Sequence, residues 1–371
     1  MLLILGLLLY FCMVMIVDAD PDKSLLRLAL IPLFIILYKF KPVWDNYLAE
    51  QKSNQALKRF FLILLVLLSI ARCLQFQHKL KKPIGFIEDI AVLNKDAFHT
   101  FFIEHKNPYQ EKINSYRVGD KDYAGYKYPP LQIFTYAPFV WLAGQKGIYW
   151  GNLLSYIGLG LLLYFVLLPY GRLYAYLGTV LYLATDYHYV LSFNHGTNDH
   201  LPSLLMLAAL ICYQANKHKH SGLALGLALL GKQLPGLILG LFLFVYREWK
   251  VVLMAAIVFI IGSLPFMIWD FQSYYENTFE FALTRPVRET SILIYMKPFW
   301  QKLTQLLGLI GVISIAHVGK RNSRYLNLKI STIGLFIGTC LFLITAKMTP
   351  AHYFVWTTGL MILSYLIPIK K

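Results

Sequence analysis

The sequence has few charged residues: 15% of its 371 residues are Asp, Glu, Lys or Arg, whereas 57% are hydrophobic. No stretch is both long and polar enough to form a soluble domain. Instead, apolar runs of roughly 17 to 25 residues recur, which is the length that a helix needs to cross the hydrocarbon core. The composition therefore predicts an all-α, polytopic transmembrane helical bundle in which residues 1–371 form a single membrane domain.

Cysteine and acidic residues are also scarce. The four cysteines lie in or beside apolar runs at no ligand spacing, which excludes a disulfide framework and a cysteine metal site. The 35 basic residues outnumber the 19 acidic ones and give a net charge of +16. These basic residues gather in short loops between apolar runs, so they indicate membrane topology and contact with membrane lipids, and we expect no nucleic-acid partner.

The apolar pattern predicts about 11 to 12 membrane segments, some of them short or re-entrant. They run over 2–17, 25–40, 57–77, 128–143, 148–168, 172–190, 201–215, 221–231 continuing into 234–246, 251–269, 298–317, 328–346 and 351–369. The first run has no basic residue before it and no small-residue cleavage motif after it, so we expect a retained span. With the second run it would form an additional N-terminal helical hairpin, 1–56.

Basic residues around 39–59 place the loop after the second span inside, which sends the longest polar stretch, 78–127, outside. If one segment between 128 and 190 does not cross, and if the chain turns at Lys232, then the polar stretches 194–200, 270–297 and 346–353 also face outside. Which segment fails to cross is left open. This convergence predicts an active site on the extracytoplasmic side.

The first outer loop contains an amphipathic helical pattern that ends at Asn107-Pro108 and is typical of a helix lying in the membrane interface. Its apolar stripe consists of Ile90, Leu93, Ala97 and Phe101, widened by Phe98 and Phe102. Asp89, beside Glu88, begins this helix and could act as general base toward an acceptor hydroxyl. Alternatively, both acids are N-terminal helix charges that the macrodipole favours.

Lys232-Gln233 interrupts an apolar stretch, and Pro235 follows. A charge at this depth costs about 2.5–3.5 kcal/mol on insertion scales. Lys232 therefore either binds an anion such as a phosphate group or extends to the interface. Residues 270–297 form the second predicted outer loop. Arg285 and Arg288 in this loop could bind phosphate oxygens through their guanidinium forks, or they could be solvated loop charges.

The stretch "FNHGTNDH" concentrates His195, Asn198, Asp199 and His200 at a helix boundary, at a spacing that offers no clean metal-ligand set. It predicts either sugar recognition or a polar loop in which Asp199 caps the next helix. In "KMTPAHYFVW", which also contains Lys347 and Tyr353, His352 could donate to a phosphate or a sugar hydroxyl. The alternative is that these are ordinary interfacial residues.

The stretch "YKYPP" fixes where the first outer loop ends and the next helix begins. Proline is tolerated in the first helical turn, and the residue before a proline is pushed into an extended conformation. Pro129-Pro130 is therefore predicted to anchor the downstream end of the loop that carries Asp89. Lys127 at this junction could also meet a lipid phosphate.

The order of these motifs resembles one family. After the early acid come "NPY", "YPPL", "HGTND", "GLALGLALLGKQLPGLILGLFLF" and a terminal "P-x-HY". From about Phe86 to the C-terminus this order is similar to the GT-C glycosyltransferases, and among them to glycosyltransferase family 87. By that resemblance Asp89 matches the catalytic aspartate, Tyr128-Pro129-Pro130 the helix start, Lys232 the helix break, and His352-Tyr353 the C-terminal pair. The family often has Gly-Gln where this chain has His195 to Asn198, so sugar specificity does not carry over.

The resemblance implies an inverting transferase that moves a hexose, most readily mannose, from a polyprenyl-phosphate donor to a lipid-linked or glycan hydroxyl. A monophosphate leaving group surrounded by cations requires no divalent metal, so we expect no metal and no cofactor. The phosphate ligands would be Lys232, Arg285, Arg288 and His352. Further substrate contacts would come from Glu88, Tyr128, Asn198, Asp199, His200, Gln233, Lys347 and Tyr353. The location implied is a multi-pass protein of a prokaryotic plasma membrane.

Two other functions remain open at this point. A transporter or lipid flippase would often show duplicated halves, and the sequence has no internal repeat. A different GT-C enzyme that uses a lipid-pyrophosphate donor would depend on a metal held by paired acids. Metal-dependent activity would favour this second alternative.

Overall fold

The computed structural model describes residues 41–81, 90–113, 115–118, 120–185, 189–287, 291–322, 328–346, 353 and 355–368. The chain forms two compact units. The first is made from Met1–His78, Ile157–Tyr189 and Val287–Lys371, and the second from Lys79–Tyr156 and Val190–Pro286. The predicted spans 2–17 and 25–40, and with them most of the predicted N-terminal hairpin, lie outside the described residues.

The protein is an all-α membrane protein, as predicted. Four helical stretches of the described chain are long and apolar enough to cross a membrane: Gln55–Lys81, Leu131–Tyr170, Trp249–Trp269 and Pro298–Arg321. Shorter apolar helices cover His200–Gln214, Gln233–Val245, Ser331–Thr345 and Val355–Leu366. All of them coincide with apolar runs in the sequence, because a helix that satisfies its own backbone is the form in which such a run can enter lipid.

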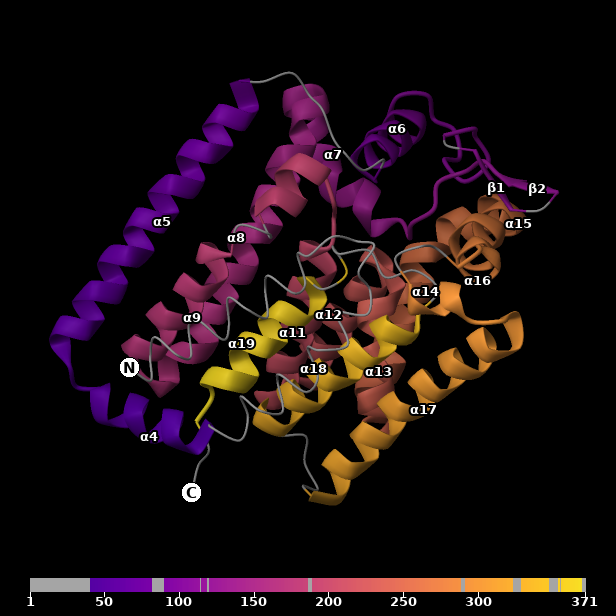
Figure 1. The fold of residues 1–371 in the computed structure, drawn as a ribbon. Coiled ribbons are helices and arrows are strands. Elements are labelled where there is room, and N and C mark those ends of the chain that lie inside the picture. Colours follow the sequence, from indigo (N-terminus) through magenta and orange to yellow (C-terminus); the bar gives the residue numbers. More distant parts are fainter. Residues whose placement is uncertain are drawn as a thin grey trace. The chain divides into compact units, whose positions relative to one another are not determined.

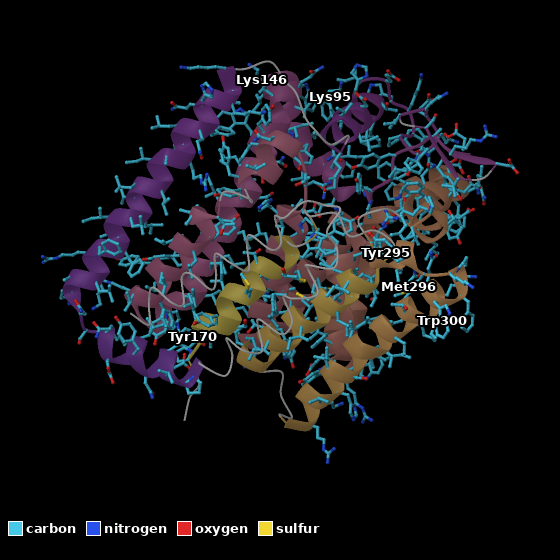
Figure 2. The ribbon with its side chains drawn as sticks, in the orientation of Figure 1. Lys95, Lys146, Tyr170, Tyr295, Met296 and Trp300 are labelled. Carbon is cyan, nitrogen blue, oxygen red and sulfur yellow. The ribbon has the colours of Figure 1, made fainter. Side chains whose placement is uncertain are left out.

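The first unit contains α4 (Lys41–Gln51), α9 (Arg172–Ala184), α17 (Pro298–Asn322), α18 (Leu328–Thr345) and α19 (Val355–Leu366), together with most of α5 (Gln55–Lys81) and the second half of α8 (Gly147–Leu167). Helix α18 packs between α17 and α19, and α19 also contacts α9 (Figure 1). The short η5 (Ile292–Tyr295) precedes α17. Figure 2 shows Tyr295, Met296 and Trp300 together at the start of α17, where both aromatic side chains are exposed, as is typical of membrane–water interfaces.

Helix α4 was not predicted, because the sequence around it was interpreted as a basic loop. Trp44 and Leu48 lie four residues apart, so they fall on one helical face, and both are buried. The Trp44 ring packs against Tyr365 with the ring centroids 5.5 Å apart. Pro42 in the first turn is the signal that the sequence offered for this helix start.

The second unit contains α6 (Ile90–Phe102), α7 (Leu131–Ala143), α11 (His200–Gln214), α12 (His218–Gly231), α13 (Gln233–Val245) and α14 (Trp249–Trp269). Helix α12 packs against both α11 and α14 (Figure 1). A Cβ atom at Gly222 would lie 2.5 Å from Cβ of Met254, and one at Gly226 would lie 2.5 Å from Cβ of Val258. The Gly-x-x-x-Gly pair is therefore what lets α14 approach α12 this closely.

The amphipathic helix predicted within the polar stretch 78–127 is confirmed as α6. Its apolar face packs against α7 and α14: the Phe101 ring lies 5.3 Å from that of Phe266, and the Phe102 ring 5.9 Å from that of Phe134. The helix ends before the expected Asn107-Pro108. His105 adopts a left-handed conformation (φ 56°), which turns the chain away from the helix axis, and Lys106 N–H donates to Thr100 O beyond the turn. Its position in the membrane interface stays a prediction.

The stretch 78–127 also contains a β-hairpin that the fold prediction did not include. Strands β1 (Tyr116–Val118) and β2 (Lys121–Tyr123) pair antiparallel, with Val118 opposite Lys121. The two intervening residues are Gly-Asp, which is a hairpin-turn signal that the sequence contained. The hairpin is followed along the chain by the double proline that begins α7.

Candidate functional site

The second unit contains a break between α12 and α13 at the position the sequence predicted. Helix α12 ends at Gly231, α13 begins at Gln233, and Lys232 between them is extended (φ −160°, ψ 124°). Pro235 explains the break, because a proline ring clashes with the carbonyl four residues earlier and provides no N–H for it. That carbonyl, Gly231 O, instead accepts a hydrogen bond from Nε2 of Gln132 at 2.9 Å.

Lys232 and Asp199 form a buried ion pair at this break. The ammonium Nζ lies 2.6 Å from Oδ1 of Asp199, and the two side chains are 5% and 0% exposed. The same Nζ lies 5.7 Å from the ring centroid of Tyr128, which precedes α7. We call Tyr128, Asp199 and Lys232 the helix-break site. The ion pair explains how a charge can be retained in an apolar segment, since removing either partner would leave the other charge buried.

A chain of hydrogen bonds fixes the segment before Asp199. Nδ1 of His200 and Oγ of Ser192 are 2.9 Å apart, and the backbone carbonyl of Ser192 accepts from Nδ2 of Asn152 at 2.7 Å. The hydroxyl of Tyr136 donates to the same Asn152 side chain. These bonds join α7, the first half of α8, the π-helical turn η3 (Leu191–His195) and α11. His200, predicted as a substrate contact, is thus a buried neighbour of the ion pair.

Three further polar side chains adjoin the break: Gln132, Asn198 and Thr278. Asn198 directly precedes Asp199, and the backbone carbonyl of Thr278 is 3.4 Å from Nε2 of Gln233. All three are buried, and each has a side-chain atom with no hydrogen-bond partner among the described residues. Such an atom costs about 1–3 kcal/mol. Asn198 was predicted from the sequence, whereas Gln132 was signalled only by its polarity within an apolar run and Thr278 by nothing.

The helix start predicted after the double proline is confirmed. Helix α7 begins at Leu131, directly after Pro129-Pro130, and the carbonyl of Tyr128 accepts a hydrogen bond from the Tyr109 hydroxyl at 2.8 Å. This contact connects the two ends of the segment 109–128. The downstream end of the stretch 78–127 is therefore held at Tyr128, the residue whose ring lies near the Lys232 ammonium.

The Lys127 side chain is bonded to groups of the protein, and its predicted contact with a lipid phosphate stays a prediction. Its Nζ donates to the carbonyls of Tyr123 (2.6 Å) and Gly125 (2.5 Å) and to Oδ1 of Asn277 (2.8 Å). Asn277 in turn donates to Tyr109 O at 3.0 Å. We call Tyr109, Gly125, Lys127 and Asn277 the loop junction. It ties the stretch 78–127 to the stretch 270–297, because Asn277 belongs to the π-helical turn η4 (Glu276–Glu280).

A surface ion-pair cluster lies beside the junction. Nζ of Lys121, in the hairpin, is 2.9 Å from carboxylate oxygens of both Glu276 and Glu280. The hydrogen bond with Glu276, and then that with Glu280, raises the pKa of Lys121 above its ordinary value. The hydrogen bond from Lys121 lowers the pKa of Glu280. Arg285 follows immediately after α16 (Phe281–Thr284), with φ −49° and ψ 144°.

Several predicted site residues are not described by the structure: Glu88, Asp89, Arg288, Lys347 and His352. Their roles therefore stay predictions. Tyr353 is buried in the first unit, with its ring stacked on Trp356 at a centroid distance of 4.4 Å. In the part of the chain that is described, no group of three or more His, Cys, Asp or Glu side chains could hold a metal ion. The expectation of a metal-independent reaction stays a prediction as well.

In a comparison with protein-family models, residues 126–364 match the model described as glycosyltransferase family 87. The match covers more than half of the chain and includes Tyr128, Asn198, Asp199, Lys232 and Gln233. No curated protein and no solved structure matches significantly. The matched region begins two residues before the helix-break site and so contains all three of its members.

Proposed function

Because the chain belongs to glycosyltransferase family 87, we propose that it transfers a hexose, with mannose the first candidate, from a polyprenyl-phosphate donor to a hydroxyl of a lipid-linked or glycan acceptor. The family establishes the chemistry as glycosyl transfer and favours it over transport. The donor, the acceptor, inversion and an extracytoplasmic active site are the parts that we propose.

The observation that carries the proposal is that Lys232, in the second unit, is buried at the helix break beside Asp199 and the Tyr128 ring. A polyprenyl-phosphate sugar is a phosphodiester with one negative charge. When the sugar is transferred, the polyprenyl phosphate departs as a monoester, which carries more negative charge than the diester. A cation near the phosphate therefore stabilises the transition state more than the bound donor. A phosphate oxygen would compete with the Asp199 carboxylate for the Lys232 ammonium.

The reaction would be a single displacement at the anomeric carbon. The bond from that carbon to the phosphate oxygen breaks, and the electron pair stays on the departing polyprenyl phosphate. The acceptor oxygen forms the new bond on the opposite face, so the configuration inverts. Its proton passes to a general base, for which Asp89 is our candidate. Arg285, Arg288 and His352 are further candidates for the phosphate.

The proposal is tested by incubating membranes containing the full-length protein with polyprenyl-phosphate hexoses and following transfer. We expect transfer with an inverted product anomer, retained in the presence of a chelator and reduced at least a hundredfold in Asp89→Asn. Activity with nucleotide sugars alone would overturn the donor assignment. Loss of activity in chelator, restored by a divalent cation, would favour the lipid-pyrophosphate alternative. Full activity in Asp89→Asn would remove the assigned base.

A further inference from the structure

Gln132, Asn198 and Thr278 are among the least exposed polar side chains of the second unit, at 0%, 1% and 2%. Within the described chain, no hydrogen-bond partner is found for Oε1 of Gln132, for either amide atom of Asn198 or for Oγ1 of Thr278. Buried polar atoms in native proteins are almost always hydrogen-bonded. Three such side chains in one region therefore indicate a polar partner from outside the chain.

Each of the three is connected to the same helix break. Gln132 bonds the carbonyl of Gly231 through its amide nitrogen, which places its oxygen beside the break. Asn198 adjoins Asp199, whose carboxylate holds Lys232. The backbone carbonyl of the third residue, Thr278, accepts a hydrogen bond from Nε2 of Gln233. They come from α7, from the loop before α11 and from the π-helical turn η4, and π-helical turns are frequent at functional sites.

The chemistry of these atoms matches a neutral, hydroxyl-rich ligand. The two amide oxygens accept hydrogen bonds, the Asn198 amide nitrogen donates, and a threonine hydroxyl does either. Sugar hydroxyls likewise both donate and accept. None of the three side chains carries a charge, so the set provides no counter-ion for a carboxylate or an ammonium group on the sugar.

We propose that Gln132, Asn198 and Thr278 form the subsite for the sugar ring of the donor, next to the lysine that takes its phosphate; this inference rests on the function proposed above. The subsite selects a neutral hexose over a uronic acid or an amino sugar. It discriminates among hexoses by the positions of their hydroxyl groups, because a site built to bond a hydroxyl rejects an analogue that lacks it.

The test measures binding to the purified full-length protein of two probes, farnesyl phosphate and its mannosyl ester. The variants are Thr278→Val and Asn198→Leu. Both remove the unbonded atoms, and neither removes a side-chain hydrogen bond seen in the described chain. The matched control is Thr135→Val. Thr135 lies in the same helix as Gln132, and its hydroxyl donates to the Leu131 carbonyl one turn earlier.

We expect both variants to weaken binding of the mannosyl ester about tenfold while farnesyl phosphate binds as before. Their melting temperatures should equal or exceed that of the wild type, because an unbonded buried polar group is replaced by an apolar one. The Thr135→Val control should bind both probes normally.

Three results would overturn the subsite while leaving the proposed function intact. They are unchanged ester binding in both variants, equal weakening of both probes, and unfolding caused by either substitution, which would assign these side chains to the fold. If the wild type bound neither probe, the proposed function would fail and the subsite with it. The two failures are therefore distinguished by the wild type alone.

Discussion

The helix-break site and the surface ion-pair cluster both contain a lysine at a carboxylate, yet the two lysines differ in how far they are exposed to water. The Lys232 side chain is 5% exposed and lies 2.6 Å from Asp199, whereas the Lys121 side chain is 37% exposed and lies 2.9 Å from both Glu276 and Glu280. Water solvates the charge of the exposed lysine if its glutamates are removed. The buried lysine is shielded from water, so its burial raises the cost of losing Asp199.

The largest effect is expected at the buried pair. Asp199→Asn and Lys232→Met should each lower the free energy of unfolding by about 3–5 kcal/mol, because each leaves one charge buried without its partner. The double variant Asp199→Leu with Lys232→Met should recover most of that loss, since apolar replacement of a buried pair is often neutral. Thermal unfolding in detergent measures both.

Activity separates the two roles of this pair. The double variant should stay inactive although its stability returns, because it lacks the cation that we assign to the phosphate. An active double variant would contradict that assignment. A double variant no more stable than the single ones would instead contradict the ion-pair argument.

Asn277 should give the second largest effect. It accepts from Gly125 N–H and Lys127 Nζ and donates to the carbonyls of Tyr109 and Ser273. Asn277→Leu leaves these groups without their partner, and we expect a loss of about 2–4 kcal/mol. Limited proteolysis should then cleave the segment 109–128 first. Resistance equal to the wild type would show that the junction does not hold the loop.

The substitution Lys127→Met tests whether Lys127 holds its own loop in place or binds the donor phosphate. We expect a loss of about 1–2 kcal/mol from the missing hydrogen bonds and an unchanged KM for the lipid-phosphate donor. Lys232→Gln should instead raise that KM. If Lys127→Met raised KM at unchanged stability, the lysine would bind the donor and the junction assignment would be wrong.

The smallest effect is expected at Lys121, and it should depend on pH. The lowered pKa of Glu280 means that its contribution is present above the ordinary glutamate pKa and is lost as the pH falls through the lower value. The raised pKa of Lys121 means that its contribution is lost only as the pH rises above about 10.5. Protease sensitivity of the hairpin should thus stay low between about pH 5 and 10 and rise in acid. In Lys121→Gln it should be independent of pH in the acid range.

Much of the fold could be predicted because membrane helices are long, apolar and locally satisfied. The predicted segments 57–77, 148–168 and 251–269 match α5, α8 and α14 to within a few residues. What was missed is short and depends on neighbours. Helix α4 is stabilised by burial of Trp44 and Leu48, and the hairpin is docked through Lys121 onto η4, which no local pattern encodes.

The sequence predicted Lys232 and Asp199 as site residues, but it did not predict that they pair with each other. Lys232 and Asp199 each stood out as polar residues at helix boundaries, but a separation of 33 residues gave no reason to join them. The sequence suggested that Lys232 binds a phosphate or extends to the interface, and that Asp199 takes part in sugar recognition or caps a helix. Asp199 does directly precede α11, yet its side chain makes no capping bond and meets the lysine instead.

By itself the sequence determined the membrane helices, the break at Lys232 and the helix start after Pro129-Pro130, because hydropathy and proline act through the chain within one turn. Only the tertiary structure decided which charge faces which. Lys232 donates to Asp199, and Lys127 donates to carbonyls of its own loop. Gln132 donates to the carbonyl of Gly231, which Pro235 leaves without a backbone partner. These choices depend on distances between helices, because a buried charge or carbonyl must find its partner wherever the packing places one.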